Sequence, residues 1–255
     1  MLQPLNIIKV GGAVVEDSAS LTDLLRTFAL LPGSKVLVHG GGRAATQVAA
    51  KMDIESRMVE GRRITDADML RVVTMVYGGL VNKNIVARLQ ALGVNALGLT
   101  GADLGYMLSE KRLVGDIDFG FVGDVKKTDA ALLTQLIESG VVPVLAPLTH
   151  DGKGSLLNTN ADTIASEAAK ALSQSFDVTL TYCLEKGGVL LDTGDEGSVI
   201  ARLSRDLFRR LAADGTIAGG MIPKIANAFH ALDNGVKRVV ITHAKNLEGG
   251  TEIVG

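Results

Sequence analysis

The stretch K-V-L-V-H-G-G-G-R, residues 35–43, runs from a short apolar segment through three consecutive glycines toward a helical pattern. A second stretch of the same form lies upstream, where L-N-I-I-K-V (5–10) is followed by G-G-A (11–13). Short apolar runs that end in glycine and lead into a helix are typical of strand–turn–helix units in a parallel sheet. The two stretches therefore predict an α/β fold whose first two strands each end in a glycine turn.

The same alternation continues along the chain and indicates a mostly parallel sheet covered by helices on both faces. We expect a soft boundary near S-Q-S-F-D (173–177), which divides two lobes of one continuous fold. The expected strands are 5–10, 35–39, 94–99, 141–148, 178–184 and 236–242, the expected helices are 20–30, 43 onward, 65–77, 82–92, 128–140, 160–172, 205–213 and 222–234, and region 106–126 is expected to form hairpins.

Composition narrows the classes of protein to which the chain can belong. The 255 residues are 47% hydrophobic and 21% charged, which is typical of a globular protein with a large core. The net charge of −2 and the scattered basic residues exclude a general nucleic-acid or acidic-membrane footprint. A single cysteine, Cys183, excludes an internal disulfide and a cysteine metal cluster and fits a reducing cytoplasm. No apolar run reaches the roughly 18–20 residues of a membrane helix, and Lys9 interrupts the first one, so we expect a cytoplasmic protein.

The two glycine turns are candidates for an anion-binding site. In an open parallel sheet, ligands bind beyond the carboxyl ends of the strands, where glycines let backbone N–H groups approach an anion. Two plain tight turns are the alternative, although a turn needs one glycine rather than three. A loose dinucleotide fingerprint also fits G-x-G-x-x-A at 40–45, but no strand ending in an acidic residue follows about 20 residues later.

Two lysines stand where a bound anion would explain them. Lys9 lies inside an apolar strand two residues before Gly11, and Lys224 follows Pro223 in the first turn of a helix. A lysine in a buried strand is costly, and a cation at a helix N-terminus opposes the helix dipole, unless an anion is bound. An edge-strand lysine and an ordinary solvated lysine are the alternatives.

Further polar residues follow the expected strands. In L-N-T-N-A-D (157–162), Asn160 suits an N-cap, whereas Asn158 and Asp162 are not required by capping; Asp162 either favours the helix dipole or holds two lysines. In G-R-R (61–63), Arg63 either clamps a carboxylate through its planar fork or is solvated. His39 is expected to be a packed core residue, and the histidines show no metal-ligand spacing.

Taken together in their order, these motifs resemble the amino-acid kinase family, and within it the branch that phosphorylates N-acetyl-L-glutamate. The resemblance covers nearly the whole chain, and several ordered motifs are far more specific than any one of them. It rests on I-I-K-V-G-G, V-H-G-G-G, E-G-R-R-I-T, G-x-V-N-K (79–83), V-G-D-V-K (122–126), L-N-T-N-A-D and G-G-M-I-P-K (219–224).

The resemblance implies a three-layer αβα sandwich around a mainly parallel sheet of about eight strands. It implies an N-terminal lobe (1–173) that binds the acyl-amino acid and forms the dimer, and a C-terminal lobe (174–255) that binds ATP. The reaction would phosphorylate the γ-carboxylate of N-acetyl-L-glutamate in arginine biosynthesis, with Mg²⁺ carried on the ATP phosphates. The implied catalytic residues are Lys9, Lys224 and Asp162; the substrate-binding residues are Gly41, Gly42, Arg63, Asn158 and Asn160; Gly12 and Gly41 hold phosphate; and Glu185, Lys186, Gly187, Gly188, Val189, Thr216 and Ile217 hold the nucleotide.

The chain differs from the family pattern at two places. The family's S/T-D-V-x-G segment is replaced by Y-C-L-E-K-G-G-V-L (182–190), which is one residue longer and lacks the aspartate. The chain also starts directly on its first strand, without the helix that links arginine-inhibited members into hexamers, so we expect a homodimer without arginine feedback. An N-succinyl-L-glutamate kinase and a catalytically silent amino-acid or nucleotide sensor on the same fold remain alternatives.

Overall fold

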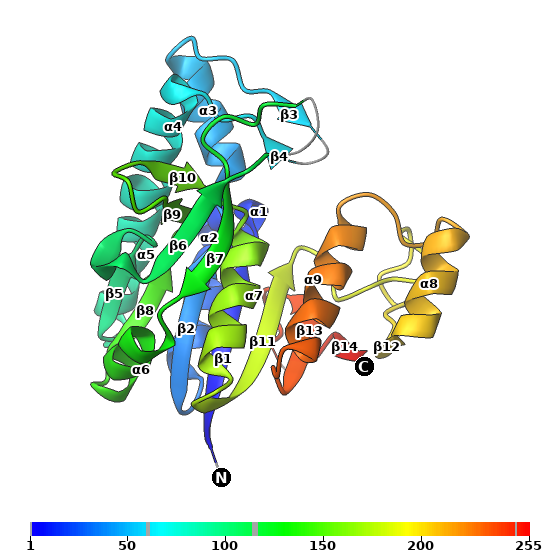
Figure 1. Cartoon of the computed structure of the whole chain (residues 1–255). Helices are drawn as coiled ribbons and strands as arrows, with labels where there is room; N and C mark the ends of the chain where they lie inside the picture. The colour runs from blue at the N-terminus through cyan, green and yellow to red at the C-terminus, as the bar shows by residue number, and fades with distance from the viewer. Residues whose placement is uncertain (1, 60–61, 114–116, 248) are drawn as a thin grey trace.

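An eight-stranded, mainly parallel sheet runs through the whole chain (Figure 1). The computed structural model describes residues 2–59, 62–113, 117–247 and 249–255, so Glu60 and Gly61 of the E-G-R-R motif and part of the expected hairpin region lie outside the described residues. The strand order is β12-β14-β13-β11-β1-β2-β8-β5, and the β13–β14 pair is antiparallel. The strands are β1 (Gln3–Val10), β2 (Ser34–His39), β5 (Ala96–Leu99), β8 (Val142–Leu145), β11 (Phe176–Leu184), β12 (Arg202–Ser204), β13 (Arg238–His243) and β14 (Thr251–Val254).

Helices cover both faces of this sheet, because alternate residues of each buried strand point to opposite sides. On β1, Ile7 packs into one core with α6, α7 and α9, whereas Ile8 packs into a second core with the helices of the N-terminal half. The expected three-layer αβα sandwich is confirmed. The helices are α1 (Gly12–Glu16), α2 (Ser18–Leu30), α3 (Gly42–Lys51), α4 (Ala67–Val73), η1, a π-helix (Thr74–Val81), α5 (Asn82–Ala91), η2, a 3-10 helix (Asp103–Gly105), α6 (Ala130–Glu138), α7 (Ala161–Leu172), α8 (Arg205–Ala213) and α9 (Met221–Asp233).

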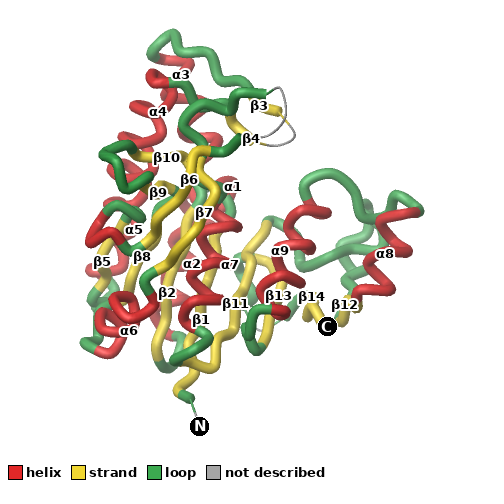
Figure 2. Tube along the Cα trace, in the orientation of Figure 1, coloured by secondary structure: helices red, strands yellow, loops and turns green. Residues whose placement is uncertain are grey.

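A second, four-stranded sheet stands beyond the carboxyl ends of the main strands in the N-terminal half (Figure 2). Its order is β10-β9-β6-β7, and the hairpin of β3 (Met58–Val59) and β4 (Arg62–Arg63) lies close to it. The strands of this sheet are β6 (Met107–Lys111), β7 (Gly123–Thr128), β9 (Leu148–His150) and β10 (Leu156–Asn158). The antiparallel β6–β7 pair agrees with the expected hairpin region. The arrangement places polar loops over one end of the main sheet. None of the described helices is long and apolar enough to cross a bilayer.

The structure differs from the sequence-based expectation at several elements, among them the following three. The expected helices 65–77 and 82–92 are joined by η1 into one continuous rod, because Gly78 and Gly79 sit in a π-helical turn instead of ending the helix. The expected strand 141–148 divides into β8 and β9 around Pro147, which has no N–H group for a ladder. The short strand β14 was not expected, since its four residues carry too little pattern to be recognised.

Gly120 ties the loops above the sheet together through a backbone conformation that favours glycine. Its φ is +70°, and a Cβ there would lie 2.2 Å from the carbonyl oxygen of Thr65. Gly140 also has a positive φ, +81°, but a Cβ there would meet nothing within 4 Å. We expect Gly120→Ala to lower the free energy of unfolding by about 2–5 kcal/mol and Gly140→Ala by about 1–2 kcal/mol, measured by urea denaturation. Equal losses in the two variants would contradict the close approach of Gly120 to Thr65.

Candidate active site

Three charged side chains from separate parts of the chain meet at the carboxyl end of β1. The Asp162 carboxylate lies 2.7 Å from the Lys9 ammonium nitrogen through Oδ1 and 2.6 Å from the Lys224 ammonium nitrogen through Oδ2. The three side chains are only 8%, 15% and 13% exposed for Lys9, Asp162 and Lys224. The sequence left Asp162 either to favour the helix dipole or to hold two lysines, and the structure brings its carboxylate into contact with both lysines.

The electrostatics of this cluster leave one cation uncompensated. Burial alone would raise the pKa of Asp162, but the ammonium groups of Lys9 and Lys224 hold it well below its usual range, so Asp162 is ionised. Burial and the neighbouring Lys9 charge lower the pKa of Lys224, and the Asp162 carboxylate opposes this shift. Two ammonium groups facing one carboxylate favour the approach of a further anion.

Local helix geometry places two members of the cluster. Asp162 lies in the first turn of α7, where the side chain of the N-cap residue Asn160 accepts a hydrogen bond from the Asp162 N–H at 2.7 Å. Lys224 lies in the first turn of α9, directly after Pro223. Because α7 and α9 pack against each other, the relative position of these helices sets the distance between Asp162 and Lys224.

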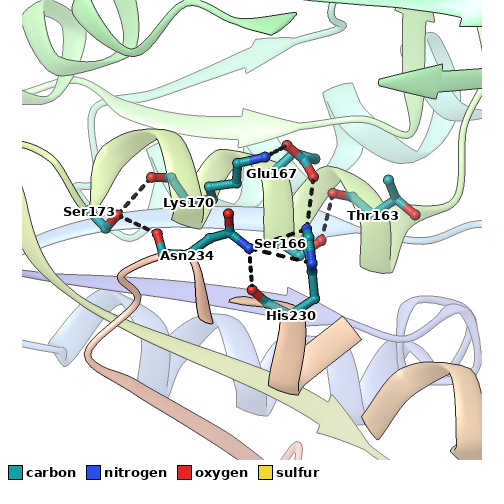
Figure 3. A network of polar contacts seen from close by, with 7 residues as sticks. All are labelled: Thr163, Ser166, Glu167, Lys170, Ser173, His230 and Asn234. Carbon is teal, nitrogen blue, oxygen red and sulfur yellow. Dashed lines mark hydrogen bonds and ion pairs between the residues drawn. The ribbon is translucent and has the colours of Figure 1, made fainter. Parts of the chain in front are cut away.

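A polar network holds α7 and α9 together away from the charged cluster (Figure 3). The Glu167 carboxylate accepts a hydrogen bond from Lys170 at 3.2 Å and lies 3.8 Å from Nε2 of His230 on α9. The Ser173 hydroxyl donates to the carbonyl oxygen of Lys170 at 2.7 Å and lies 3.4 Å from that of Asn234. The network fixes the two helices along their length and thereby supports the cluster at their N-termini.

The two glycine turns face each other beside the cluster. A Cβ on Gly12 would lie 3.6 Å from the backbone nitrogens of both Gly41 and Gly42, and a Cβ on Gly40 would lie 3.1 Å from the nitrogen of Gly12. A Cβ on Gly41 would lie 3.0 Å from the ring of Tyr77, which η1 carries. A side chain at Gly40 or Gly41 would therefore have little room, because a second backbone and an aromatic ring lie there, and glycines of both turns line the same cavity as Lys9.

Three cavities converge on this point. One, of about 210 Å³, extends toward the second sheet and is lined by Lys9, the glycines of both turns, Arg63 and Asn158. A second, of about 540 Å³, extends toward α9 and is lined by Asp162, Gly219, Gly220 and Lys224. A third, of about 350 Å³, lies between the first glycine turn and Glu185. Asp162 lines the first two cavities, so ligands in them would meet at the charged cluster.

The first cavity carries fixed polar groups. The Arg63 guanidinium donates to the carbonyl oxygen of Gly42 at 2.8 Å, to the Thr46 hydroxyl at 2.9 Å and to the Ser56 hydroxyl. Asn158 donates to the Thr65 hydroxyl at 3.0 Å. Arg63 and Asn158 are held in place by neighbouring residues at the cavity wall, which suits recognition of a small polar anion.

His39 packs against the second glycine turn from the buried core. It is fully buried, with Nδ1 2.8 Å from the carbonyl oxygen of Gly40 and Nε2 3.1 Å from the amide nitrogen of Asn82. The same amide nitrogen donates to the carbonyl oxygen of Val144 at 2.9 Å, so Asn82 is the donor and His39 is neutral with its proton on Nδ1. His39 is thus a packed core residue, as predicted, and it also anchors Gly40.

Of the predicted nucleotide-binding residues, Glu185 alone lines one of the three cavities. Glu185 lines the third cavity and lies 4.0 Å from Arg43. Val189 is buried, and its N–H donates to the Thr251 hydroxyl at 2.8 Å. Ile217 packs in the core, and neither Ile217 nor Thr216 is among the residues that line the three cavities. Lys186, Gly187 and Gly188 form the turn between Glu185 and Val189.

Sequence reasoning missed several residues at the site. Tyr77 and Thr159 line the first cavity, and Gly219 and Gly220 line the second. The glycine pair before M-I-P-K was a usable signal, because glycines ahead of a helix N-terminus expose backbone N–H groups. Nothing in the sequence around Tyr77 indicated a role at the site, since the position of Tyr77 depends on the π-helical turn. Among the described residues, no group of three or more His, Cys, Asp or Glu side chains is placed to hold a metal ion.

Comparison with known proteins places this geometry in a family. A sequence model described as the amino acid kinase family matches residues 4–243. The chain is 63% identical over 255 residues to an acetylglutamate kinase of Bacteroides thetaiotaomicron, with 99% of each chain covered. It is 54% identical over 247 residues to an acetylglutamate kinase of Cytophaga hutchinsonii, covering 96% of this chain and 94% of that one. A solved structure from Streptococcus mutans aligns with a TM-score of 0.81 at 27% identity and 98% coverage of both chains.

The neutral state of His39 makes folding sensitive to acid. Burial lowers the pKa of His39 to about 4, and the nearby Lys83 charge adds to this, while the hydrogen bond to Gly40 opposes it. Since an unfolded histidine titrates near ~6.5, His39 contributes stability that is present above that pH and is lost as pH falls toward about 4. We expect the loss between pH 7 and 4.5 to be about 2–3 kcal/mol, measured by urea denaturation. His39→Asn keeps a donor for Gly40 but does not titrate, so an unchanged acid slope in this variant would contradict the assignment.

Proposed function

Because the chain belongs to the amino acid kinase family, we propose that it transfers the γ-phosphoryl group of ATP to the γ-carboxylate of N-acetyl-L-glutamate. The products are ADP and the γ-acyl phosphate, as in an early step of arginine synthesis. The observation that carries the proposal is Asp162 held between Lys9 and Lys224 where two cavities meet. The relatives named acetylglutamate kinase, which match over nearly the whole chain, support the choice of acceptor.

The reaction needs charge neutralisation rather than a base. A γ-carboxylate is already ionised at neutral pH, so it attacks the γ-phosphorus directly and the bond to the ADP oxygen breaks. The obstacle is the approach of two anions, which costs about 5 kcal/mol for one pair of unit charges at ~3.5 Å and an effective dielectric of ~20. Phosphoryl transfer is therefore mainly a matter of positioning and of cations near the transferring group.

Lys9 and Lys224 are proposed to stabilise the phosphoryl group in transit. Their ammonium groups stand on opposite sides of the Asp162 carboxylate, which orients both and leaves donors on each for phosphoryl oxygens. Backbone N–H groups at Gly12 and Gly41 are proposed to hold the same oxygens. This arrangement places donors where negative charge develops, and such preorganised donors reorganise little during the reaction.

The 210 Å³ cavity is the proposed site of the acyl-amino acid. Arg63 is proposed to clamp the α-carboxylate, Asn158 to contact the acyl-amino group, and Gly41, Gly42 and Asn160 to complete the site. The γ-carboxylate would then point toward Lys9, which lines the same cavity. The N-terminal lobe (1–173) would thus bind the acceptor.

The cavity of about 540 Å³ beside α9 is the proposed entrance for ATP. Gly219, Gly220 and Lys224 line it and would face the phosphates, while the C-terminal lobe (174–255), with Glu185–Val189, Thr216 and Ile217, would hold the nucleoside. Mg²⁺ is proposed to enter as the MgATP substrate, since the Asp162 carboxylate is already paired with two lysines. We place the reaction in the cytoplasm, where ATP is available.

A homodimer is proposed through the β5 edge of the N-terminal half. Four large apolar side chains on or near η1 and β5 are exposed: Met75 (49%), Leu80 (53%), Leu97 (39%) and Leu104 (67%). Exposed apolar groups along a sheet edge favour association between copies. We expect light scattering to give twice the chain mass of 26.6 kDa, and Leu80→Lys to give monomer. A monomeric wild-type protein would refute the dimer.

The acceptor is tested by trapping the acyl phosphate with hydroxylamine while ADP release is followed. We expect hydroxamate from N-acetyl-L-glutamate and none from aspartate or carbamate, because these lack the γ-carboxylate that reaches Lys9. N-succinyl-L-glutamate and glutamate belong in the same panel, since the acyl group is the part of the acceptor that the proposed contacts constrain least. Absence of hydroxamate with either N-acylglutamate would refute the kinase assignment.

The two lysines should matter for kcat. We expect Lys224→Ala and Lys9→Ala each to lower kcat by about 10²–10³, by analogy with removal of one transition-state donor. Lys237→Ala is a matched control, because Lys237 pairs with Asp177 on the surface at 2.5 Å. Steady-state kinetics with N-acetyl-L-glutamate measures the effect, and a near-normal kcat for Lys224→Ala would remove Lys224 from the chemistry.

A further inference from the structure

Tyr182 lies on β11 directly beside the charged cluster. It pairs in register with Lys9 on the neighbouring strand β1, and it is fully buried. Its side chain points to the core face that α7 and α9 cover. The Lys224 ammonium nitrogen, which comes from α9, lies 5.5 Å from the centre of the Tyr182 ring. An ammonium group within about 6 Å of an aromatic face is attracted by the ring quadrupole.

The ring, rather than the hydroxyl, is the part of Tyr182 that this site uses. The buried hydroxyl makes no hydrogen bond to any residue that the structure describes. Burial and the nearby Asp162 charge raise the pKa of Tyr182 well above its usual range, so the phenol stays neutral. A neutral side chain without a hydrogen bond offers Lys224 only its π face.

We propose that the ring of Tyr182 is a positioning element for Lys224, which holds the ammonium group over the aromatic face while Asp162 holds it from the other helix. The proposal rests on the phosphoryl transfer assigned to Lys224 above. Lys224 faces Asp162 on α7, Lys9 on β1 and Tyr182 on β11. Of these three, the carboxylate and the ring attract the ammonium group and Lys9 repels it.

Tyr182 opens the stretch Y-C-L-E-K-G-G-V-L, and its ring gives Lys224 a second restraint beside the Asp162 carboxylate. A lysine restrained by one carboxylate alone keeps rotational freedom about its long stem. A ring beneath the ammonium group removes part of that freedom and also favours the charged form in a desolvated site.

Two substitutions separate the ring from the hydroxyl. Tyr182→Phe keeps the aromatic face and removes an unpartnered buried hydroxyl, so kcat and thermal stability should stay at or above the wild-type level. Tyr182→Leu removes the face and should lower kcat roughly 5- to 30-fold, the effect of a desolvated cation–π contact. KM for N-acetyl-L-glutamate should not change, because Tyr182 is not among the residues lining the acceptor cavity.

A fluorinated series tests the electrostatic origin without a change of shape. Phenylalanine, difluorophenylalanine and trifluorophenylalanine at position 182 fill the same space, while each fluorine weakens the negative ring face. We expect kcat to fall stepwise along the series, with unchanged melting temperatures. Equal kcat in the three proteins would overturn the proposal, and this comparison remains available even where Tyr182→Leu fails to fold.

A double-mutant cycle tests whether the effect passes through Lys224. In a Lys224→Ala background, Tyr182→Leu should cause no further loss of kcat, because the ring then has no ammonium group to hold. An equal loss in both backgrounds would show that Tyr182 acts through packing instead and would overturn the proposal.

An NMR titration of [ε-¹³C]lysine-labelled protein gives a readout that does not depend on activity. The pKa of Lys224 should be lower with trifluorophenylalanine than with phenylalanine at position 182, since the weakened ring no longer favours the ammonium form. Identical titration curves would overturn the ring–ammonium contact. Absence of hydroxamate from the wild-type protein would instead refute the kinase assignment, so the two failures are distinguishable.

Discussion

The Asp162 carboxylate, between two ammonium groups 2.7 and 2.6 Å away, is the interaction on which the rest of the site depends. A buried carboxylate of this kind is stable only while both cations face it, and removal of one partner leaves an uncompensated charge in the interior. The cluster therefore constrains three elements at once, because Lys9 comes from β1, Asp162 from α7 and Lys224 from α9. The packing of α7 on α9 and the parallel pairing of β1 with β11 keep these elements in register.

The two glycine turns line the same cavity as Lys9 and Asp162. Gly40 lies so close to the backbone of Gly12 that a side chain there has little room, and the Tyr77 ring closes the space over Gly41. The buried pair of His39 and Asn82 holds the second turn from beneath. Backbone N–H groups and ammonium groups thus converge on one small volume, which explains how a fold without an evident general base serves a reaction between two anions.

Sequence reasoning found the two lysines of the cluster because each stands in a locally unfavourable place. A lysine in an apolar strand and a lysine at a helix N-terminus both need an anion, and Lys9 and Lys224 were recognised on that ground. Tyr182 and Tyr77 carried no such conflict, since a tyrosine in a strand or a helix satisfies local preferences. Their importance comes only from what lies across from them, namely Lys224 and Gly41.

The sequence by itself determined the α/β alternation, the glycine turns after the first two strands and the lysines that demand an anion, because these are local patterns of hydrophobicity, backbone freedom and charge. Only the tertiary structure decided that both turns line one cavity with Asp162 and that the glycines 78–79 sit in a π-helix instead of ending a helix. It also decided the split of 141–148 around Pro147 and the pairing of the short β14. These features depend on contacts between residues that are far apart in the chain. A short stretch of sequence does not report the energies of such contacts.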